Sequence, residues 1–400
     1  MTLLPVADAL ARVLADIAPP VEEVVPITEA AGRVLAQDLA AKLTQPPFDA
    51  SAMDGYAVHG DGAALIGMQW RVIGESAAGR GFTGEVGLGQ AVRIFTGAPV
   101  PQGCGTVVIQ EDISRAGDLI TAIDRTALGA NIRRAGDDFS QGQVLLTRGR
   151  RLEAHTVTLA AAMGYGAVPV ARRPVVAILA TGDEVVPPGT LPGPDQIVSS
   201  NPVGLAALVA ETGGVVRFLG IAPDRMEAIT AGIADARDAD VLVTIGGASV
   251  GDHDLVGAAL KEQGLDLAFW KVALRPGKPL MFGRLGAQRA LGLPGNPVSA
   301  LVTARVFLVP LIRALLGEPA EARKLETAIL TAPLEANGPR LHLMRARLGR
   351  DAAGALTVTP SRSQDSSLLA ALVEADALIW REPETREAEA GELVRVERLD

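Results

Sequence analysis

Three glycine-containing turns in the second half of the chain have the residues to bind phosphate groups. Each turn follows an apolar run: Thr181-Gly182-Asp183-Glu184 follows VVAILA, Gly246-Gly247-Ala248-Ser249 follows VLVTI, and Pro294-Gly295-Asn296-Pro297 follows ALGL. Glycine lets backbone N–H groups approach a ligand closely, and helix N-termini favour anions. The turns could therefore cradle phosphates, although the glycines in any one of them could simply close a tight turn.

Carboxylates stand beside two of these turns and at the start of a helix expected between them. The group consists of Asp183, Glu184, Asp224, Asp252 and Asp254. Carboxylate oxygens next to phosphates are typical of Mg²⁺ rather than of a transition metal. Asp224 has a competing structural role, because Asp224 and Glu227 have the spacing of a helix capping box. His253 could act as a base, although a lone histidine near a helix start is more often a polar surface residue.

Three cations around a Pro-Gly turn are the basic counterpart of these acids. The run FWKVALRPGKP contains Lys271, Arg275 and Lys278, and the prolines of PGKP would hold Lys278 in a fixed position. Such a group in an acidic protein suits a phosphate or another oxyanion. The alternative is a solvated surface loop whose charges contribute little.

The segment 46–58, PPFDASAMDGYAV, combines two prolines with Asp49, Asp54 and Tyr56 in a short run that lacks the pattern of a packed helix or strand. One interpretation is a rigid loop that presents a carboxylate to a ligand. The other is a turn in which an aspartate bonds its own backbone.

A different enzyme class is suggested by G-x-S-x-G at 247–251, which matches the nucleophile elbow of α/β-hydrolases. That chemistry needs a downstream histidine, and the one candidate well downstream is His342, in a region expected to be β-structured. The sequence GDHD also separates the serine from the next helix. These features disfavour a hydrolase.

Composition restricts the class further. The 400 residues carry a formal net charge of −9, which disfavours nucleic acid and anionic membranes as partners. The single cysteine, Cys104, excludes an intramolecular disulfide and a thiolate zinc site. The N-terminus lacks the basic region of a signal peptide, and arginines interrupt the apolar stretch 298–316, which favours a buried helix over a membrane span. We therefore expect a cytoplasmic protein.

Hydrophobic spacing predicts a discontinuous N-terminal region around a β-rich insertion. A first helix is expected over 6–17 and a second from Thr28, with an apolar side of Val34, Leu35 and Leu39. From 44 to about 143, short β-rich runs alternate with glycine-rich turns. Helical spacing returns over 153–163.

From Pro174 the pattern changes to alternating strands and helices. Runs such as PVVAILA are apolar on both faces, as in a parallel sheet covered by helices. The series predicts a doubly wound α/β domain, whose ligands bind beyond the carboxyl ends of the strands, where the three turns lie. From about 325 strand-like runs return, with a helix near 368–375, which predicts a small β-barrel or sandwich.

Six motifs in register closely resemble the molybdopterin molybdenumtransferases, the family that includes the E domain of gephyrin. They are PPFDASAMDGYAV, IFTGAPVP, ATGDEVV, TIGGASVGDHD, LRPGKP and LPGNPVSA. The resemblance covers nearly the whole chain, and the expected divisions match the family's four-domain plan. That plan places the two parts of an N-terminal domain at 1–43 and 144–173, a β-rich insertion with the MDG loop at 44–143, an α/β/α molybdopterin-binding domain at 174–322, and a C-terminal β-barrel at 323–400.

The resemblance implies the last step of molybdenum cofactor assembly. The enzyme would bind adenylylated molybdopterin, insert molybdate at the dithiolene sulfurs with the help of Mg²⁺, and release AMP. A homodimer is implied, with an active cleft between the α/β domain of one subunit and the N-terminal part of the other. Contacts with molybdopterin adenylyltransferase and apo-molybdoenzymes follow from the same pathway. Molybdate and tungstate, both tetrahedral dianions, remain alternatives.

The family pattern also assigns roles to single residues. The pterin phosphate would lie at Gly246, Gly247 and Ser249, and Asp54 and Thr96 would come from the partner subunit. Metal ligation is assigned to Asp183, Glu184 and Asp254. The catalytic candidates are Asp54, Thr96, Glu184, Asp224 and Asp254. The other substrate contacts are Thr181, Gly182, Lys271, Arg275, Lys278, Pro294, Asn296, Pro297, Arg345 and Ser366.

Molybdate would meet Ser249 and cationic donors from two domains. The pattern places Arg275 and Lys278 at its site, with Arg345 and Ser366 from the C-terminal domain. Asp365 stands beside this serine where glycine is usual. Its carboxylate would repel molybdate unless it points away.

Two other functions share part of this pattern. A molybdopterin adenylyltransferase has the same α/β domain, but the N-terminal domains and the MDG loop argue against it. A binding scaffold of the gephyrin kind would hold a partner peptide at the dimer. The intact acidic and basic positions favour catalysis over the scaffold.

Overall fold

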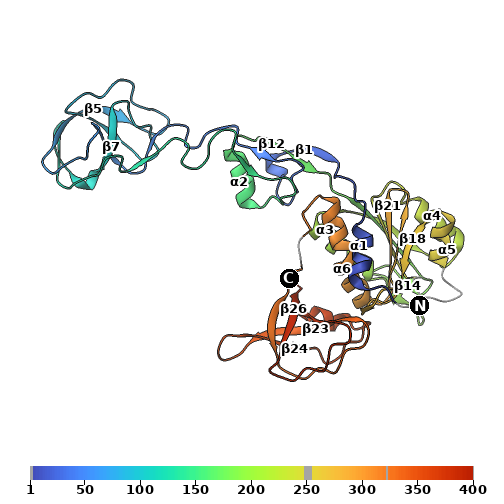
Figure 1. Cartoon of the computed structure of the whole chain (residues 1–400). Helices are drawn as coiled ribbons and strands as arrows, with labels where there is room; N and C mark the ends of the chain where they lie inside the picture. Colours follow the sequence, from blue (N-terminus) through green and yellow to red (C-terminus); the bar gives the residue numbers. More distant parts are fainter. Residues whose placement is uncertain (1–2, 247–254, 321–322, 400) are drawn as a thin grey trace. The chain divides into compact units, whose positions relative to one another are not determined.

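The computed structural model describes residues 3–246, 255–320 and 323–399. The chain divides into two compact units: Val24–Val170 is one, and Met1–Glu23 together with Ala171–Asp400 is the other (Figure 1). A two-stranded sheet pairs β1 (Glu22–Pro26) with β12 (Ala167–Ala171), where the chain passes between the units. The finer domain limits given above stay predictions.

The unit Val24–Val170 is built mainly of strands, and its residues 44–143 are β-rich as expected. Its six-stranded sheet has the order β7-β4-β6-β5-β9-β8. The strands are β4 (Gly55–His59), β5 (Gln69–Ser76), β6 (Gln90–Ile94), β7 (Cys104–Ile109), β8 (Ile113–Ala116) and β9 (Leu119–Ala122). Tyr56 and Trp70 lie in its buried core. The smaller elements are β2 (Leu39–Ala40), β3 (Ala50–Ser51), η2 (Gln110–Asp112), β10 (Ile132–Arg133), β11 (Val144–Leu146) and the expected helix α2 (Ala154–Ala162).

The prediction of a second N-terminal helix from Thr28 is wrong. One 3₁₀ turn forms instead (η1, Ile27–Glu29), and Val34 and Leu35 join isolated β-bridges. Gly32 turns the chain at φ +77°, and the Leu35 N–H then donates to the carbonyl of Arg150 at 3.0 Å rather than to its own turn. The apolar residues are buried as predicted, but pairing with a distant segment, not helical periodicity, buries them.

The second unit contains the predicted α/β sheet. Its strand order is β16-β13-β17-β21-β20-β18, and the first four strands are parallel. The strands are β13 (Val175–Thr181), β16 (Val215–Ala222), β17 (Val241–Ile245), β18 (Asp266–Trp270), β20 (Met281–Leu285) and β21 (Gln288–Leu293). A short parallel pair is formed by β14 (Val185–Val186) and β15 (Ile197–Val198). The strands β20 and β18 form an antiparallel edge that the sequence did not predict.

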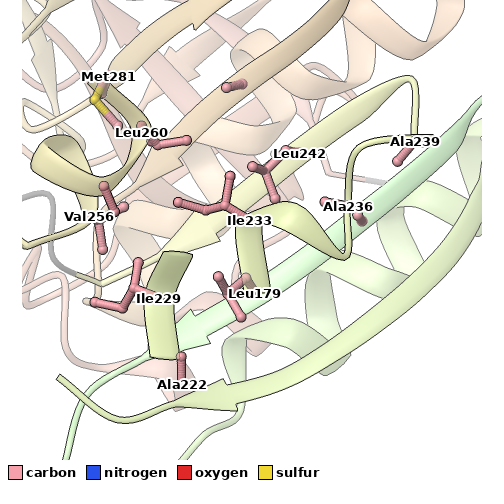
Figure 2. Packing of buried hydrophobic residues seen from close by; sticks show 13 residues of the cluster. Leu179, Ala222, Ile229, Ile233, Ala236, Ala239, Leu242, Val256, Leu260 and Met281 are labelled. Atoms are coloured by element: carbon pink, nitrogen blue, oxygen red, sulfur yellow. The ribbon is translucent and has the colours of Figure 1, made fainter. Parts of the chain in front are cut away.

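Helices pack against this sheet and bury an aliphatic core. They are α1 (Val6–Leu14), α3 (Asn201–Thr212), α4 (Met226–Ala234), α5 (Leu255–Glu262) and α6 (Pro297–Leu315). Figure 2 shows Ile229 and Ile233 of α4 beside Leu179 and Leu242 of the sheet. In the described part of the chain, α6 is the one helix long and apolar enough to cross a membrane, and 61% of that stretch is buried inside the protein. This burial matches the expected core helix.

The C-terminal strands close into a barrel. They are β22 (Glu326–Leu330), β23 (Leu341–Arg350), β24 (Leu356–Pro360), β25 (Ala377–Arg381) and β26 (Leu393–Arg398). Their order is β23-β24-β22-β26-β25, and pairing of β25 with β23 completes the ring. The short strand β19 (Leu274–Arg275) adds to β23 from outside, and α7 (Leu369–Val373) follows the loop after β24. The barrel alternative is confirmed, whereas β19 and β25 were not predicted.

Candidate active site

The structure brings the three predicted turns together at one edge of the α/β sheet. Strands β13, β17 and β21 are parallel neighbours, so their carboxyl ends lie side by side. Gly246 has φ +92°, and a Cβ there would lie 2.8 Å from the carbonyl oxygen of Thr181. A Cβ at Gly295 would lie 4.0 Å from the Gly246 Cα. Gly246 therefore has to be glycine, because both its conformation and its neighbours exclude a side chain.

Part of the predicted phosphate site lies outside the described residues. Residues 247–254 are not described, and they include the candidates Gly247, Ser249, Asp252, His253 and Asp254; Ser249 is also the serine of the hydrolase alternative. Their assigned roles stay predictions.

Asp224 is grouped with the acids that follow β13. The capping-box prediction is wrong: α4 begins at Met226 with Arg225 as its N-cap, without a side-chain capping bond. The Asp224 N–H instead donates to Asp183 Oδ1 at 3.0 Å. Burial raises the pKa of Asp224, and the negative charges of Asp183 and Glu184 raise it further. The acids thus carry a negative potential that a bound cation would relieve.

Asp183 and Glu184 border an open hollow of about 550 Å³, which is also lined by the loop residues Gly193–Gln196. The one sequence signal for this loop is the proline- and glycine-rich run LPGPDQ, which by itself does not indicate a binding site. A second hollow of about 510 Å³ shares Asp183 but is largely apolar, with the half-exposed Phe218 on its wall. Nothing in the sequence pattern marked it.

The oxygens at this edge suit a hard cation, but the described residues do not complete its site. A Cβ at Gly182 would lie 2.5 Å from Glu184 Oε2, which places that carboxylate directly above the turn. In the described ranges, which omit Asp254, there is no group of three His, Cys, Asp or Glu side chains that could hold a metal. Asp183 and Glu184 therefore fit Mg²⁺ in their chemistry and need a further ligand.

Asn296 and Ser366, two predicted contacts from distant parts of the sequence, bond each other. Asn296 Nδ2 donates to Ser366 Oγ at 2.9 Å, and the Val298 N–H donates to the Ser366 carbonyl at 3.1 Å. On the other side, Asn201 Nδ2 donates to the Gly295 carbonyl at 2.6 Å. The start of α6 is thus tied both to α3 and to the C-terminal loop.

The predicted cations lie on a rigid turn. The Val272 N–H donates to the Lys278 carbonyl at 3.0 Å, and Gly277 packs so closely on α6 that a Cβ would lie 2.2 Å from Thr303 Oγ1. Lys271 adopts the strained φ of +76°. Among the residues that the structure describes, no acid forms an ion pair with Lys271, Arg275 or Lys278, which leaves their charge available to an anion.

The same excess of positive charge affects the pKa of a buried histidine, His342. Arg275 lies in register with His342 across the β19–β23 pair. Burial lowers the pKa of His342, the charges of Arg275, Arg340, Arg381 and Arg345 lower it further in that order, and together they bring it to about 4. His342 was considered above only as a hydrolase histidine, and no sequence signal pointed to this environment.

Arg345 makes a different kind of contact from the other predicted cations. It is 1% exposed, and its guanidinium donates to the carbonyls of Ser363, Asp365 and Leu368. The Asp365 carboxylate bonds within its own turn, since Oδ1 accepts the Ser367 N–H at 2.9 Å and its hydroxyl at 2.8 Å. The Asp365 charge is therefore engaged locally.

In the unit Val24–Val170, the two predicted residues Asp54 and Thr96 bond each other. The Thr96 N–H and hydroxyl both donate to Asp54 Oδ1, each at 2.8 Å, and these bonds lower the pKa of Asp54. Gly55 of the MDG sequence packs against β7, where a Cβ would lie 2.0 Å from the Val108 carbonyl oxygen. The expectation of a loop over the whole of 46–58 is wrong, because Gly55–His59 form β4 and Tyr56 is buried, but Asp54 just before this strand is an exposed carboxylate held in a fixed position.

Asp49, the other acid of this segment, has a structural role. Arg134 Nη1 donates to Asp49 Oδ2 at 2.5 Å and the Ala135 N–H to Oδ1 at 2.9 Å. These bonds lower the pKa of Asp49. The carboxylate is used within the fold.

Comparison with known families defines the class of this multidomain α/β protein. The MoeA N-terminal region (domain I and II) matches residues 4–164, a probable molybdopterin binding domain matches 177–314, and the MoeA C-terminal region (domain IV) matches 327–399. The molybdopterin biosynthesis MoeA protein from Pyrococcus horikosii has a TM-score of 0.85 at 30% identity, and the match covers 100% of both chains.

Curated relatives give the family its name. The molybdopterin molybdenumtransferase of Haemophilus influenzae is 37% identical over 93% of this chain and 92% of its own length. That of Bacillus subtilis is 34% identical over 99% of this chain and 94% of its own length. The chain belongs to the molybdopterin molybdenumtransferase family of enzymes.

Proposed function

We propose that this enzyme inserts molybdate into adenylylated molybdopterin and releases AMP, forming molybdenum cofactor. The observation that carries the proposal is a pair of charge groups in one unit. The first group consists of the acids at the strand ends, where burial and the charges of Asp183 and Glu184 raise the pKa of Asp224. The second group consists of Lys271, Arg275 and Lys278, which have no acidic partner among the described residues. A polyanionic substrate bound with a divalent cation would neutralise both groups.

The positively charged side chains on the Pro-Gly turn suit molybdate, which is a dianion. Arg275 and Lys278 supply fixed positive charge to molybdate, and the Ser366 hydroxyl beside Asn296 supplies a neutral donor. The pterin and its phosphates bind to the three turns at the strand ends. The contacts come from Thr181, Gly182, Gly246, Gly247, Ser249, Pro294 and Pro297. Positioning and charge neutralisation, rather than a covalent nucleophile, provide most of the rate.

Asp183 and Glu184 would hold Mg²⁺, together with Asp254. When bound, the ion would screen the phosphate charges of the substrate. Asp224 lies against Asp183 and would be held ionised once the cation reduces the local negative potential. Asp54, oriented by Thr96, would contribute a carboxylate from the partner subunit of a homodimer. We further propose that the reaction takes place in the cytoplasm, with molybdopterin adenylyltransferase and apo-molybdoenzymes as handover partners.

Calorimetry with molybdate, in the presence and absence of adenylylated molybdopterin, tests the proposal. We expect molybdate to bind the wild-type protein, and Lys278→Ala to weaken binding by about tenfold. Lys261→Ala, which removes an exposed lysine of α5, is the matched control and leaves binding unchanged. Equal affinity in the Lys278→Ala and control proteins would contradict the role of the cation group.

Product analysis separates the other two functions. Incubation with ATP and molybdopterin would give adenylylated pterin without molybdate if the protein were an adenylyltransferase. For a scaffold, Asp54→Ala and Glu184→Ala would leave molybdate-dependent AMP release unchanged. We expect neither result.

A further inference from the structure

The loop 361–368 wraps around one buried side chain. Arg345 of β23 donates from its guanidinium to three carbonyls of this loop, at Ser363 (3.0 Å), Asp365 (2.8 Å) and Leu368 (2.9 Å). Arginine presents its N–H donors in a rigid planar fork, so three carbonyls bound to it have their directions fixed. The side chain therefore determines the path of the loop.

Gln364 ties the same loop to the backbone of β23. Its Oε1 accepts the Arg345 N–H at 2.9 Å, and its Nε2 donates to the carbonyls of Arg345 at 3.0 Å and Ser361 at 3.2 Å. The Ser361 N–H donates to the Arg345 carbonyl at 2.8 Å. A side-chain amide thus continues, at Arg345, the hydrogen bonding that β24 provides to residues 346–350 of β23.

The residue that this clamp places is Ser366. Its carbonyl accepts the Val298 N–H in the first turn of α6, and its hydroxyl accepts Asn296 Nδ2. Helix N-termini leave backbone N–H groups without a partner inside the helix, so the Val298 bond anchors the loop to α6. The position of the hydroxyl beside Asn296 follows from the position of the loop.

We infer that Arg345 and Gln364 are positioning residues that hold Ser366 at the start of α6, and that Arg345 acts through the loop rather than through its own charge. The inference rests on the proposed function, in which Ser366 contacts molybdate. Two contrasts support it. Arg345 is buried and bonded to neutral carbonyls, whereas Arg275 is exposed and has no ion pair with a described acid. Gln364 carries no charge and belongs to the same clamp.

Substitutions in the full-length protein test the clamp. Arg345→Lys keeps the charge and loses the planar fork, and Gln364→Leu removes the amide. We expect each to weaken molybdate binding in calorimetry by about tenfold, as much as Ser366→Ala does, and combination with Ser366→Ala to add little. Hydrogen exchange at the Val298 amide should accelerate in both clamp variants. Arg347→Lys, on the same strand but paired with Glu374, is the control and leaves both measurements unchanged.

Two results would overturn the inference. Faster exchange at Val298 together with wild-type affinity in Arg345→Lys would assign molybdate binding to the charge of Arg345. Wild-type exchange in both clamp variants would show that the loop does not need them. If Arg345→Lys does not fold, the affinity and the Val298 exchange of Gln364→Leu alone test the inference. If wild-type protein binds no molybdate, the proposed function fails, while exchange at Val298 still tests the clamp.

Discussion

Two aspartates among the site candidates have opposite electrostatic environments. Asp54 receives two hydrogen bonds from Thr96 on one carboxylate oxygen, and these bonds lower its pKa. Asp224 is partly buried beside Asp183 and Glu184, and burial and like charge raise its pKa. The first carboxylate is stabilised as an anion by the protein itself. The second belongs to a group of acids whose mutual repulsion a bound cation would relieve.

This difference separates two kinds of acid that look alike in the sequence. A carboxylate fixed by donors keeps its charge and orientation over a wide pH range, which suits a group that orients a substrate. A cluster of carboxylates that raise one another's pKa suits metal binding, because the metal supplies the positive charge that this part of the protein lacks.

Asp54→Asn should reduce molybdate-dependent AMP release by about 10²–10³-fold, because the amide keeps the shape but loses the charge that Thr96 orients. Steady-state rates of AMP release measure the effect. Asp49→Asn is the control, since Asp49 is bonded to Arg134 and Ala135 within the fold. Equal losses in the two variants would remove the distinction between a functional and a structural acid in this segment.

Gly55→Ala should lower the free energy of unfolding by about 3 kcal/mol, because the new methyl group would overlap the Val108 carbonyl and separate β4 from β7. Urea denaturation followed by circular dichroism measures the change. Gly62→Ala is a matched control in the same unit, since no atom lies within 4 Å of a Cβ there. If Gly55→Ala is as stable as the control, the close approach does not fix the Asp54 loop.

His342 extends the comparison to positive charge. Its pKa is about 4 in the folded protein and near 6.5 in the unfolded chain, so the unfolded chain takes up the proton first as the pH falls. Stability should decrease between pH 6.5 and 4, by about 2 kcal/mol at pH 5. His342→Gln should remove this part of the pH dependence.

The matched control for this measurement is His155→Gln, which changes an exposed histidine of α2 and should keep the wild-type profile. Thermal unfolding across this pH range gives the comparison. A wild-type profile in His342→Gln would show that burial and the surrounding arginines do not lower the pKa of His342 in the folded state.

Asp224→Asn should have the smallest effect. A raised pKa means that the ionised form is disfavoured in the folded protein, so the cost is present at neutral pH and is relieved as the pH falls through the raised pKa. The variant should gain about 0.5 kcal/mol at pH 7 in the absence of Mg²⁺, after allowance for solvent screening. Mg²⁺ should stabilise the wild-type protein more than the variant.

Thermal unfolding with and without Mg²⁺ measures that difference. Asp266→Asn, an exposed acid on the far edge of the same sheet, serves as the control. An identical Mg²⁺ response in wild type and Asp224→Asn would separate Asp224 from the proposed metal site.

Local patterns predicted the parts of the fold that are determined locally. The parallel strands were visible as runs apolar on both faces, and the turns at Gly182, Gly246 and Gly295 were visible from their glycines. Their meeting at one edge followed from the topology of parallel sheets. The sequence alone was therefore sufficient to group the three turns at one site.

The failures come from interactions with distant segments. The helix expected from Thr28 does not form, because Val34 and Leu35 form β-bridges with Arg151 and Val170, more than a hundred residues away. The capping box of Asp224 failed because its N–H bonds Asp183, which the local spacing could not indicate. The contacts of Arg345 depend on where the loop after β24 returns to β23, and a single sequence contains no signal for that return.

The strand β23 has a consequence for how this protein can be divided. It completes the barrel through β24 and β25, carries His342 and Arg345, and also pairs with β19, which bears Arg275 from the preceding domain. A chimera joined near residue 322 would thus exchange the strand on which β19 rests. Recombination between relatives should preserve anion binding only when 274–278 and 341–350 are inherited together.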